Sequence, residues 1–284
     1  MKVISQSGQE EFWRVEGVSS LGGMQKAGVT SDMFAIGERV RAAGSVSVRR
    51  AKDFLATNFL LANGTEIVLG RNVEPYWSEQ YIERHDPTVA ENAPIDAGTE
   101  NRGIFRVWSG VADGVGQTTH FPFTEAAIAA RAAWNPIDNF AERCEAEGMP
   151  RIMRNPHPFE FVDHGTEIAM ISELYDLVRT IRMDPTASPL DEPASPLGYS
   201  TGRWDGKTLI VTTTHINWSY FDNIGTPQSE AVKMVERFAV SEDQSRLDYQ
   251  LTVTDPMTFS EPAVYERHWL ALGETIQRYD CQVY

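Results

Sequence analysis

The sequence predicts a mainly β protein: a small N-terminal β domain, then a larger antiparallel domain that forms a lipocalin-like barrel or a strongly curled sheet. Residues 198–211 alternate like two strands around Asp205-Gly206, a pair that tolerates the positive φ of a tight hairpin turn. Eight or nine such alternating segments follow one another after residue 157, with no helical pattern between them. A single segment, 124–134, has the composition of a helix.

Length and charge limit the possible functions. The 284 residues are 42% hydrophobic and 23% charged, which is enough to bury one large β core or two ordinary ones. The formal charge of −15 repels phosphate backbones and anionic lipid headgroups, so we expect no nucleic-acid partner. No run approaches the roughly 20 apolar residues of a membrane-spanning helix, so we also expect no membrane insertion. A hydrophobic small molecule is the expected ligand, and the oligomeric state is open.

The N-terminal domain is predicted over residues 1–71. Strand patterns occur at 12–18 and 37–48, and residues 59–69 form a hairpin pattern around Asn63-Gly64. Residues 1–10 lack the apolar stretch of a secretory signal. The predicted localisation is therefore cytoplasmic for the sequence as given, or periplasmic if a leader has been removed.

Residues 72–116 are rich in Glu, Asp, Pro, Gly and Asn, a composition typical of a linker. Within it, residues 103–108 predict one strand that joins a flanking sheet. An interaction protein that uses the acidic segment 72–102 is a third class of function.

The barrel domain is predicted over residues 117–284. Its helix begins after Thr124, which can cap it, and ends at Asn135-Pro136. Predicted strands lie near 158–162, 167–174, 176–183, 199–204, 207–214, 232–240, 246–254, 263–271 and 275–281. A barrel of about eight strands has room for one small ligand.

The chain has two cysteines, Cys144 and Cys281, without CxxC spacing. This spacing disfavours a cysteine-based zinc site. The two residues are either free buried thiols or a disulfide that joins the start of the barrel domain to its last strand.

Several blocks resemble an uncharacterised, mostly exported proteobacterial family of unknown function. They are residues 143–144, 148–153, 155–161, 195–200, 202–211, 221–230, 236–238 and 255–256, which include Pro-Arg-Ile-Met, Asn-Pro-His-Pro-Phe-Glu, Ser-Pro-Leu-Gly-Tyr-Ser, Gly-Arg-Trp-Asp-Gly and Phe-Asp-Asn-Ile-Gly-Thr-Pro-Gln-Ser-Glu. The likeness covers roughly 100–284, and residues 13–69 are similar to the small β domain that often precedes these blocks. The resemblance implies a periplasmic address but no catalytic residue.

Period-2 phasing selects candidate catalytic side chains, because an ionisable group on an apolar strand face must be paired, neutral or functional. Glu236 is in phase with Met234 and Phe238, and Arg179 is in phase with Leu177 and Ile181. The two residues form either a buried structural pair or part of a ligand site.

His215 ends the 207–214 strand in phase with inward residues, so we expect it at the barrel rim. The aromatic loop after it is either a lid over an apolar ligand or a cap on the core. The predicted substrate-binding residues are Asn217, Trp218, Tyr220, Phe221 and Asp222 of this loop, with Tyr199 and Phe159.

Tyr249 lies on the apolar face of its strand and either donates to a ligand or bonds a structural acceptor. Glu266 and His268 share one face of the last clear strand, an arrangement that suits acid/base work, although the inward side of that strand is ambiguous.

Other chemistries lack support. Residues 198–202 match GxSxG, but a nucleophile elbow needs a strand-to-helix turn and this segment lies in β context. No HxH or HxxxH pair predicts a metal site, and no glycine-rich loop opens a helix, so we expect no cofactor.

The sequence favours a cofactor-free acid/base enzyme, a lyase, hydratase or isomerase, that acts on a hydrophobic molecule in a barrel pocket. His215, Glu236 or the Glu266/His268 pair would transfer protons, and Arg179 or Tyr249 would polarise an oxygen. A non-catalytic carrier of an apolar ligand is the alternative.

Overall fold

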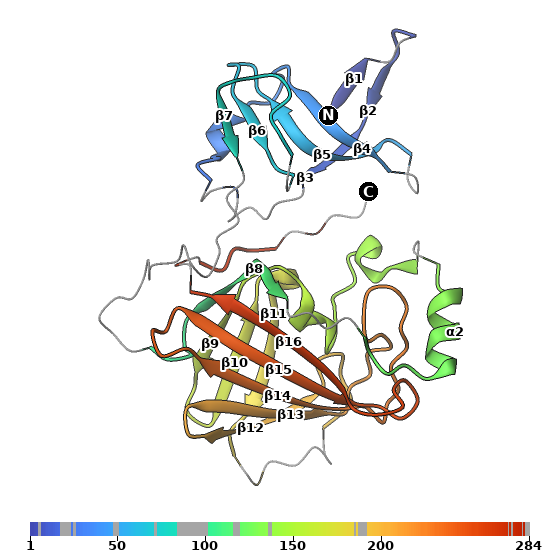
Figure 1. Ribbon diagram of the computed structural model, residues 1–284, viewed down its shortest axis with the longest axis vertical. Helices are drawn as coiled ribbons and strands as arrows, with labels where there is room; N and C mark the ends of the chain where they lie inside the picture. The colour runs from blue at the N-terminus through green and yellow to red at the C-terminus, as the bar shows by residue number, and fades with distance from the viewer. Residues whose placement is uncertain are drawn as a thin grey trace. The chain divides into compact units, whose positions relative to one another are not determined.

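The computed structural model describes residues 1–4, 7–17, 24, 27–47, 51–70, 73–83, 102–115, 120–135, 138–184, 186, 192–271, 273, 275–279 and 281. The chain divides into two compact units, Met1–Asp86 and Pro87–Tyr284. Each unit has its own hydrophobic core. Figure 1 shows the strands from which each unit is built.

The first unit consists of short strands in two sheets. β1 (Lys2–Ile4) pairs with β2 (Glu10–Phe12), and the larger sheet contains β3 (Arg14–Gly17), β4 (Arg41–Val46), β5 (Asp53–Leu60), β6 (Glu66–Val68) and β7 (Tyr81–Glu83). A 3-10 turn, η1 (Ser31–Met33), precedes β4. The β5–β6 hairpin turns through Asn63-Gly64 as the sequence predicts, with Gly64 at a φ of 87°.

The second unit is built on a closed barrel of nine strands in the order β10-β11-β12-β13-β14-β15-β16-β8-β9. The mainly β fold with one helix near 124–134 is therefore confirmed. The strands are β8 (Val107–Val115), β9 (Phe159–Asp163), β10 (Glu167–Ser172), β11 (Leu177–Arg182), β12 (Tyr199–Asp205), β13 (Thr208–Thr214), β14 (Lys233–Val240), β15 (Arg246–Thr254) and β16 (Ala263–Leu270).

Backbone pairing weakens at two places around the barrel. β11 and β12 are parallel and share only two residue pairs, Ile181↔Ser200 and Arg182↔Thr201. β8 and β9 also share two pairs. The β16–β8 contact has three pairs with a register shift, and the remaining neighbours form antiparallel ladders of five or more pairs. Side chains must therefore help to close the barrel at the two short seams.

The alternation of the strands fills the barrel interior. On β14 and β15 the side chains of Met234, Glu236, Phe238, Leu247 and Tyr249 are almost inaccessible to solvent. Large aromatic side chains, among them Trp108, Phe161 and Trp269, complete this core. The interior is a packed core in which polar groups are the exception.

The β12–β13 hairpin has its turn one residue later than predicted. Asp205 pairs with Thr208, so Gly206 and Lys207 form the two-residue loop. Gly206 takes the positive φ of 60° at the first loop position. An aspartate before the glycine can thus be the last strand residue rather than the first loop residue.

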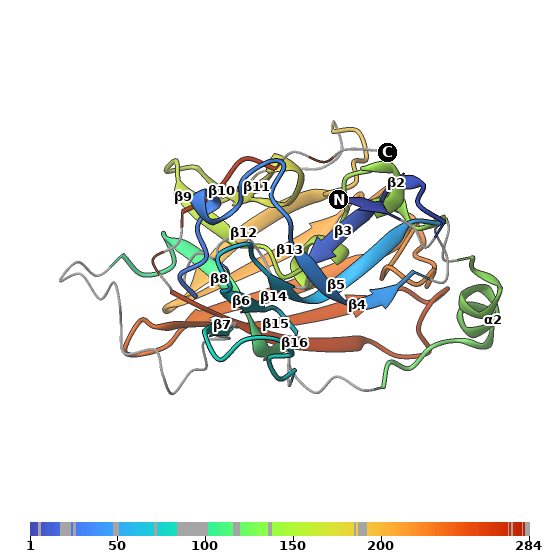
Figure 2. The ribbon, with the colours of Figure 1, turned by 90° about the horizontal axis from the view of Figure 1, so that it is seen from above.

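Helix α2 (Glu125–Ala133) lies beside one end of the barrel in both views (Figure 1 and Figure 2). Thr124 caps it as predicted, since the hydroxyl accepts from the Ala127 amide at 3.2 Å. Two 3-10 turns, η3 (Phe140–Arg143) and η4 (Arg151–Arg154), continue this connection, and η5 (Leu174–Asp176) joins β10 to β11.

The described tail residues beyond β16 form no strand, in contrast to the one predicted at 275–281. The Gln277 and Tyr279 amides donate to the Glu173 and Asp176 carboxylates at 3.1 and 3.0 Å. Cys281 is joined to Cys144 by a disulfide, which decides between the two alternatives for the cysteines. The tail is therefore held by side chains and a covalent bond in place of a sheet ladder.

The predicted linker contains a barrel strand. β8 occupies residues 107–115, so the barrel begins before residue 117, and the predicted strand at 103–108 corresponds to the approach to β8. Residues 84–101, which form the centre of the predicted interaction segment, lie outside the described residues.

Candidate functional site

The barrel interior contains a cluster of charged and hydroxyl side chains around Arg179. The guanidinium donates from Nη1 to Glu236 Oε1 at 3.0 Å and from Nη2 to Glu236 Oε2. Its Nε donates to Ser200 Oγ at 3.0 Å, and Nη2 also donates to Thr213 Oγ1 at 2.7 Å. The pairing of Arg179 with Glu236 is therefore the one that strand phasing predicts.

Tyr249 completes the cluster from β15. Its hydroxyl donates to Glu236 Oε1 at 3.0 Å. Burial, together with the adjacent Glu236 carboxylate, raises the pKa of this phenol well above its usual value. Tyr249 is therefore a neutral hydrogen-bond donor at any physiological pH.

The cluster is internally satisfied and closed to solvent. All three guanidinium nitrogens of Arg179 have a partner, and both Glu236 oxygens accept a bond. Arg179 and Glu236 are 1% and 0% exposed. Since Arg179 on β11 bonds to Ser200 on β12, the cluster also bridges the short parallel seam. A structural role in barrel closure follows directly from these contacts.

Ser200 and Thr213 also belong to the cluster, although neither was predicted as a site residue, and their hydroxyl groups hydrogen-bond to each other at 3.0 Å. Thr213 is in phase with Leu209 and Val211, so strand alternation places its hydroxyl group on the same inward face as it does the Glu236 carboxylate. Ser200 was noticed only as the centre of GxSxG, and the structure places it in a strand.

His215 is not part of this cluster. The residue is half-buried, has a φ of 56°, and its Nδ1 lies 3.1 Å from the Oγ1 of its neighbour Thr214. The left-handed backbone interrupts the alternation that would have directed its side chain inward. Among the described residues, His215 therefore has no contact with Glu236 or Arg179, which corrects the expected role at an inner rim.

The aromatic loop after His215 packs onto the core. Trp218 and Phe221 are 7% and 1% exposed, and the Trp218 ring lies 4.9 Å from the Phe140 ring. Asp222 accepts bonds from the Ile224 and Thr226 amides, both at 3.0 Å, and so fixes the loop. The loop matches the core-capping alternative rather than the lid.

The remaining predicted binding residues lie in different places. Asn217 donates to the Ala194 carbonyl at 3.0 Å, and Tyr220 lies 6.1 Å from Phe140. The Arg182 guanidinium covers the Tyr199 ring at 4.3 Å. Phe159 is in the core, 4.9 Å from Trp269. These contacts place the side chains in different surroundings, and none of the contacts is with the Arg179 cluster.

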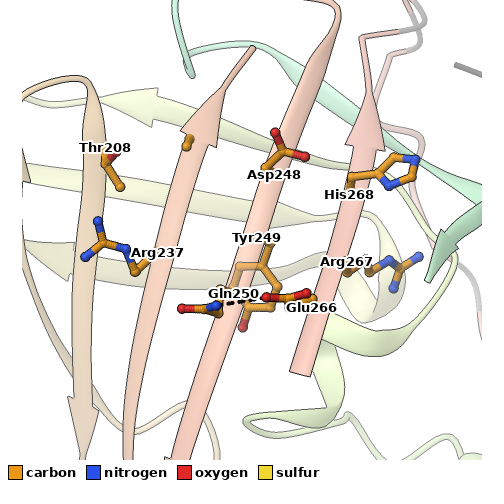
Figure 3. A pocket seen from close by; sticks show the side chains of 9 residues that line it. Thr208, Arg237, Asp248, Tyr249, Gln250, Glu266, Arg267 and His268 are labelled. Carbon is orange, nitrogen blue, oxygen red and sulfur yellow. Dashed lines mark hydrogen bonds between the residues drawn. The ribbon is translucent and has the colours of Figure 1, made fainter. Parts of the chain in front are cut away.

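Glu266 and His268 lie on the outer face of β16, because Tyr265, Arg267 and Trp269 occupy the inner face. They line a hollow of about 460 Å³ on the outside of the barrel, where Glu266 accepts from Gln250 at 2.9 Å (Figure 3). Asp248 faces His268 across the ladder. This position separates the pair from the barrel interior, in which acid/base work was expected.

A second kind of hollow opens at the end of the barrel that carries the β12–β13 turn. The rings of Phe105 and Trp204 meet edge to face at 6.4 Å, and Trp204 is 44% exposed. Hollows of about 340 and 370 Å³ flank this pair. The larger is lined in part by Ile168 of β10, Gly202 of β12 and Met183, which directly follows β11. We call these two hollows the barrel mouth.

The described residues bring no three His, Cys, Asp or Glu side chains into a metal-binding arrangement. In that same part of the chain, each helix is too short or too polar to cross a membrane. Comparisons with protein-family models, with curated proteins and with solved structures each return no match. The fold and the site define a closed nine-stranded β-barrel with a buried ion-pair cluster and an aromatic mouth.

Proposed function

We propose that this protein is a small-molecule binder that takes up an apolar ligand at the barrel mouth. The supporting observation is the Phe105–Trp204 pair with a hollow on either side. Apolar pockets with a few polar groups at the mouth of a barrel are common ligand sites. A large, half-exposed tryptophan at such a position gives an apolar ligand a flat surface for contact.

The lining of the mouth suits a ligand of low net charge. Ile168, Met183 and Val240 supply apolar surface, while Lys207 and Glu242 place both signs of charge at the edge. The protein's charge of −15 further disfavours a multiply charged anion.

The family resemblance and the periplasmic address remain part of this proposal. The Cys144–Cys281 disulfide supports an oxidising compartment, since disulfides persist there and are rare in a reducing cytoplasm. Extraction of the native protein from its host under thiol-blocking conditions tests this, and two free thiols in that material would contradict it.

Binding of the neutral fluorescent probe N-phenyl-1-naphthylamine tests the mouth. Phe105→Ala and Trp204→Ala should each weaken probe binding about tenfold, because each removes one ring of the pair. Tyr76→Ala and Trp77→Ala are matched controls, since these rings form a comparable pair at 5.9 Å in the first unit. Equal probe affinity in all four variants would rule out the mouth as the binding site.

A cofactor-free acid/base enzyme, a lyase, hydratase or isomerase, is the second candidate. The observation that favours it is the Tyr249–Glu236–Arg179 contact, because buried groups with strongly shifted pKa values concentrate at functional sites. In that case Glu236 would act as base and Tyr249 as donor to a substrate oxygen. Once a converted substrate is known, Glu236→Gln and Tyr249→Phe should each reduce kcat at least a hundredfold while KM changes little. Full turnover in both folded variants would rule out these catalytic roles and favour a non-catalytic carrier.

A further inference from the structure

Three arginines gather at the loop-rich end of the barrel, opposite the mouth. Arg151 and Arg154 come from η4, and Arg267 comes from the inner face of β16. Arg151 pairs with Glu147 at 3.3 Å. Neither Arg154 nor Arg267 forms an ion pair with a described residue, so this end holds two cations without a direct counter-ion.

Arg154 is surrounded by aromatic rings. Its Cζ lies 5.6 Å from the Phe121 ring, 5.1 Å from Phe221 and 5.0 Å from Tyr265. Such contacts attract the cation but satisfy none of its N–H donors. Its Nη1 is buried and has no hydrogen-bond partner in the described part of the chain.

Arg267 also interacts with Tyr265. It is 5% exposed, its Nη1 donates to the carbonyls of Met153 and Asn155 at 3.2 and 2.6 Å, and its guanidinium covers the Trp269 ring at 5.0 Å. Its Nε is buried and, within the described residues, has no partner. Two guanidinium groups thus neighbour one phenol, and each has an unused donor.

The acidic groups that act on Arg154 are the Tyr265 phenol and the Asp222 carboxylate, and the carboxylate is already hydrogen-bonded to other groups. Asp222 acts on Arg154 electrostatically. Its Oδ1 accepts from the Ile224 and Thr226 amides, however, and its Oδ2 accepts from the Thr226 hydroxyl at 2.6 Å. Burial lowers the pKa of both Arg154 and Arg267, which means that their charged forms lose hydration. A bound anion would offset that loss.

We propose that Arg154 and Arg267 bind the carboxylate of a small monocarboxylic acid whose apolar body packs against Phe121 and Phe221. Guanidinium groups match the planar carboxylate, and the rings supply the apolar contact. The side chains of Arg154 and Phe121 are partly exposed, so the outer edge of this site is in contact with solvent, while the unused donors lie beneath it. It is separate from the mouth and goes beyond the function proposed there.

Calorimetric titration of the full chain with phenylacetate tests the ligand class. We expect phenylacetate to bind at least tenfold more tightly than 2-phenylethanol, which lacks the charge, and than inorganic phosphate, which lacks the ring. If 2-phenylethanol bound equally well, the arginines would have no role. If phosphate bound equally well, the apolar part of the proposal would be wrong.

Arg154→Met tests the location, because methionine keeps apolar contact with the rings but removes the charge. We expect at least a tenfold loss of phenylacetate affinity, with unchanged binding of N-phenyl-1-naphthylamine at the mouth. Arg131→Met is the matched control. Arg131 is exposed, and its guanidinium lies 5.4 Å from the ring of Phe123, which belongs to the same aromatic group. Wild-type phenylacetate affinity in Arg154→Met, or an equal loss in Arg131→Met, would overturn the proposal. The comparison of ligands on the wild-type chain stands even if a variant does not fold.

Discussion

At the scale of single residues, the role of each candidate depends on which hydrogen-bond partners the neighbouring strands supply. Arg179 and Glu236 are adjacent to hydroxyl groups from three further strands, so their charges are satisfied without solvent. Arg154 and Arg267 lie among rings and carbonyls, so some of their N–H donors have no hydrogen-bond partner in the described part of the chain. The same residue type therefore has a structural role in one place and a proposed binding role in another.

Glu236→Gln should lower the free energy of unfolding by about 3–5 kcal/mol, because it leaves the Arg179 charge buried without its counter-ion. The double variant Arg179→Met/Glu236→Leu should recover most of that loss, since it removes both charges from the core. Urea unfolding followed by circular dichroism measures both. If the double variant were as unstable as the single one, barrel closure would depend on the hydrogen bonds to Ser200 and Thr213 rather than on charge balance.

Glu66 makes the first unit sensitive to acid. Burial alone would raise the pKa of its carboxyl group, but the Tyr76, Trp77 and Ser78 amides and the Asn58 side chain donate to it, and the net effect is a pKa below the usual 4.5. A lowered pKa stabilises the fold above the unfolded-state value, and this contribution is lost as the pH falls through the folded-state value. Thermal melts should therefore show the wild type losing stability below about pH 4.5 more steeply than Glu66→Gln. Parallel acid profiles for the two proteins would disprove this role.

At the scale of elements, the C-terminal tail is the least predictable part of the barrel unit. It contacts η5 through two backbone-to-carboxylate bonds and through the Tyr279 ring, which lies 4.9 Å from Tyr175. The Cys144–Cys281 bond closes a separation of 137 residues. A cross-link over so long a loop restricts the unfolded chain strongly.

Replacing both cysteines with alanine should therefore lower the free energy of unfolding of the barrel unit by about 2–5 kcal/mol, the usual range for loss of a native disulfide. Denaturant unfolding of the wild type with and without dithiothreitol is the matching measurement. The double variant should not respond to the reductant. A wild type that is equally stable in both conditions would mean that the noncovalent contacts of the tail suffice.

At the scale of the whole molecule, the two units should behave as separate cooperative systems. The first has a core around Val29, Leu61, Ile67 and Leu69, and the second has the barrel core. Each has enough buried apolar surface to unfold as its own transition.

Residues 87–284 expressed alone should therefore fold and bind N-phenyl-1-naphthylamine with the affinity of the full chain. Circular dichroism and the same probe titration check this. Loss of binding in a folded fragment would place part of the ligand site in the first unit, and failure to fold would show that the barrel depends on that unit.

Much of the fold was predictable because period-2 alternation records which strand face is buried. Eight of the predicted strands correspond to barrel strands, and the helix after Thr124 was placed within a residue. The segment 275–281 was mistaken for a strand since its alternation reflects contacts with the loop around η5 rather than a sheet ladder. Most of β8 was not predicted as a strand, because its residues Gly110 and Gly114 interrupt the pattern of large side chains that is typical of a strand.

The sequence by itself determined the inward phase of Arg179, Glu236 and Tyr249, because local alternation is enough to assign a face. It did not determine that these residues meet, since their separations along the chain, 57 positions between Arg179 and Glu236, are bridged only when the sheet closes. Tertiary structure also decided that His215 is outside the cluster and that Glu266 and His268 face outward. Only the tertiary structure brings Arg154, which lies in a turn, close to Arg267, which lies in a strand. Packing around aromatic rings of distant segments leaves no periodic signal in the sequence.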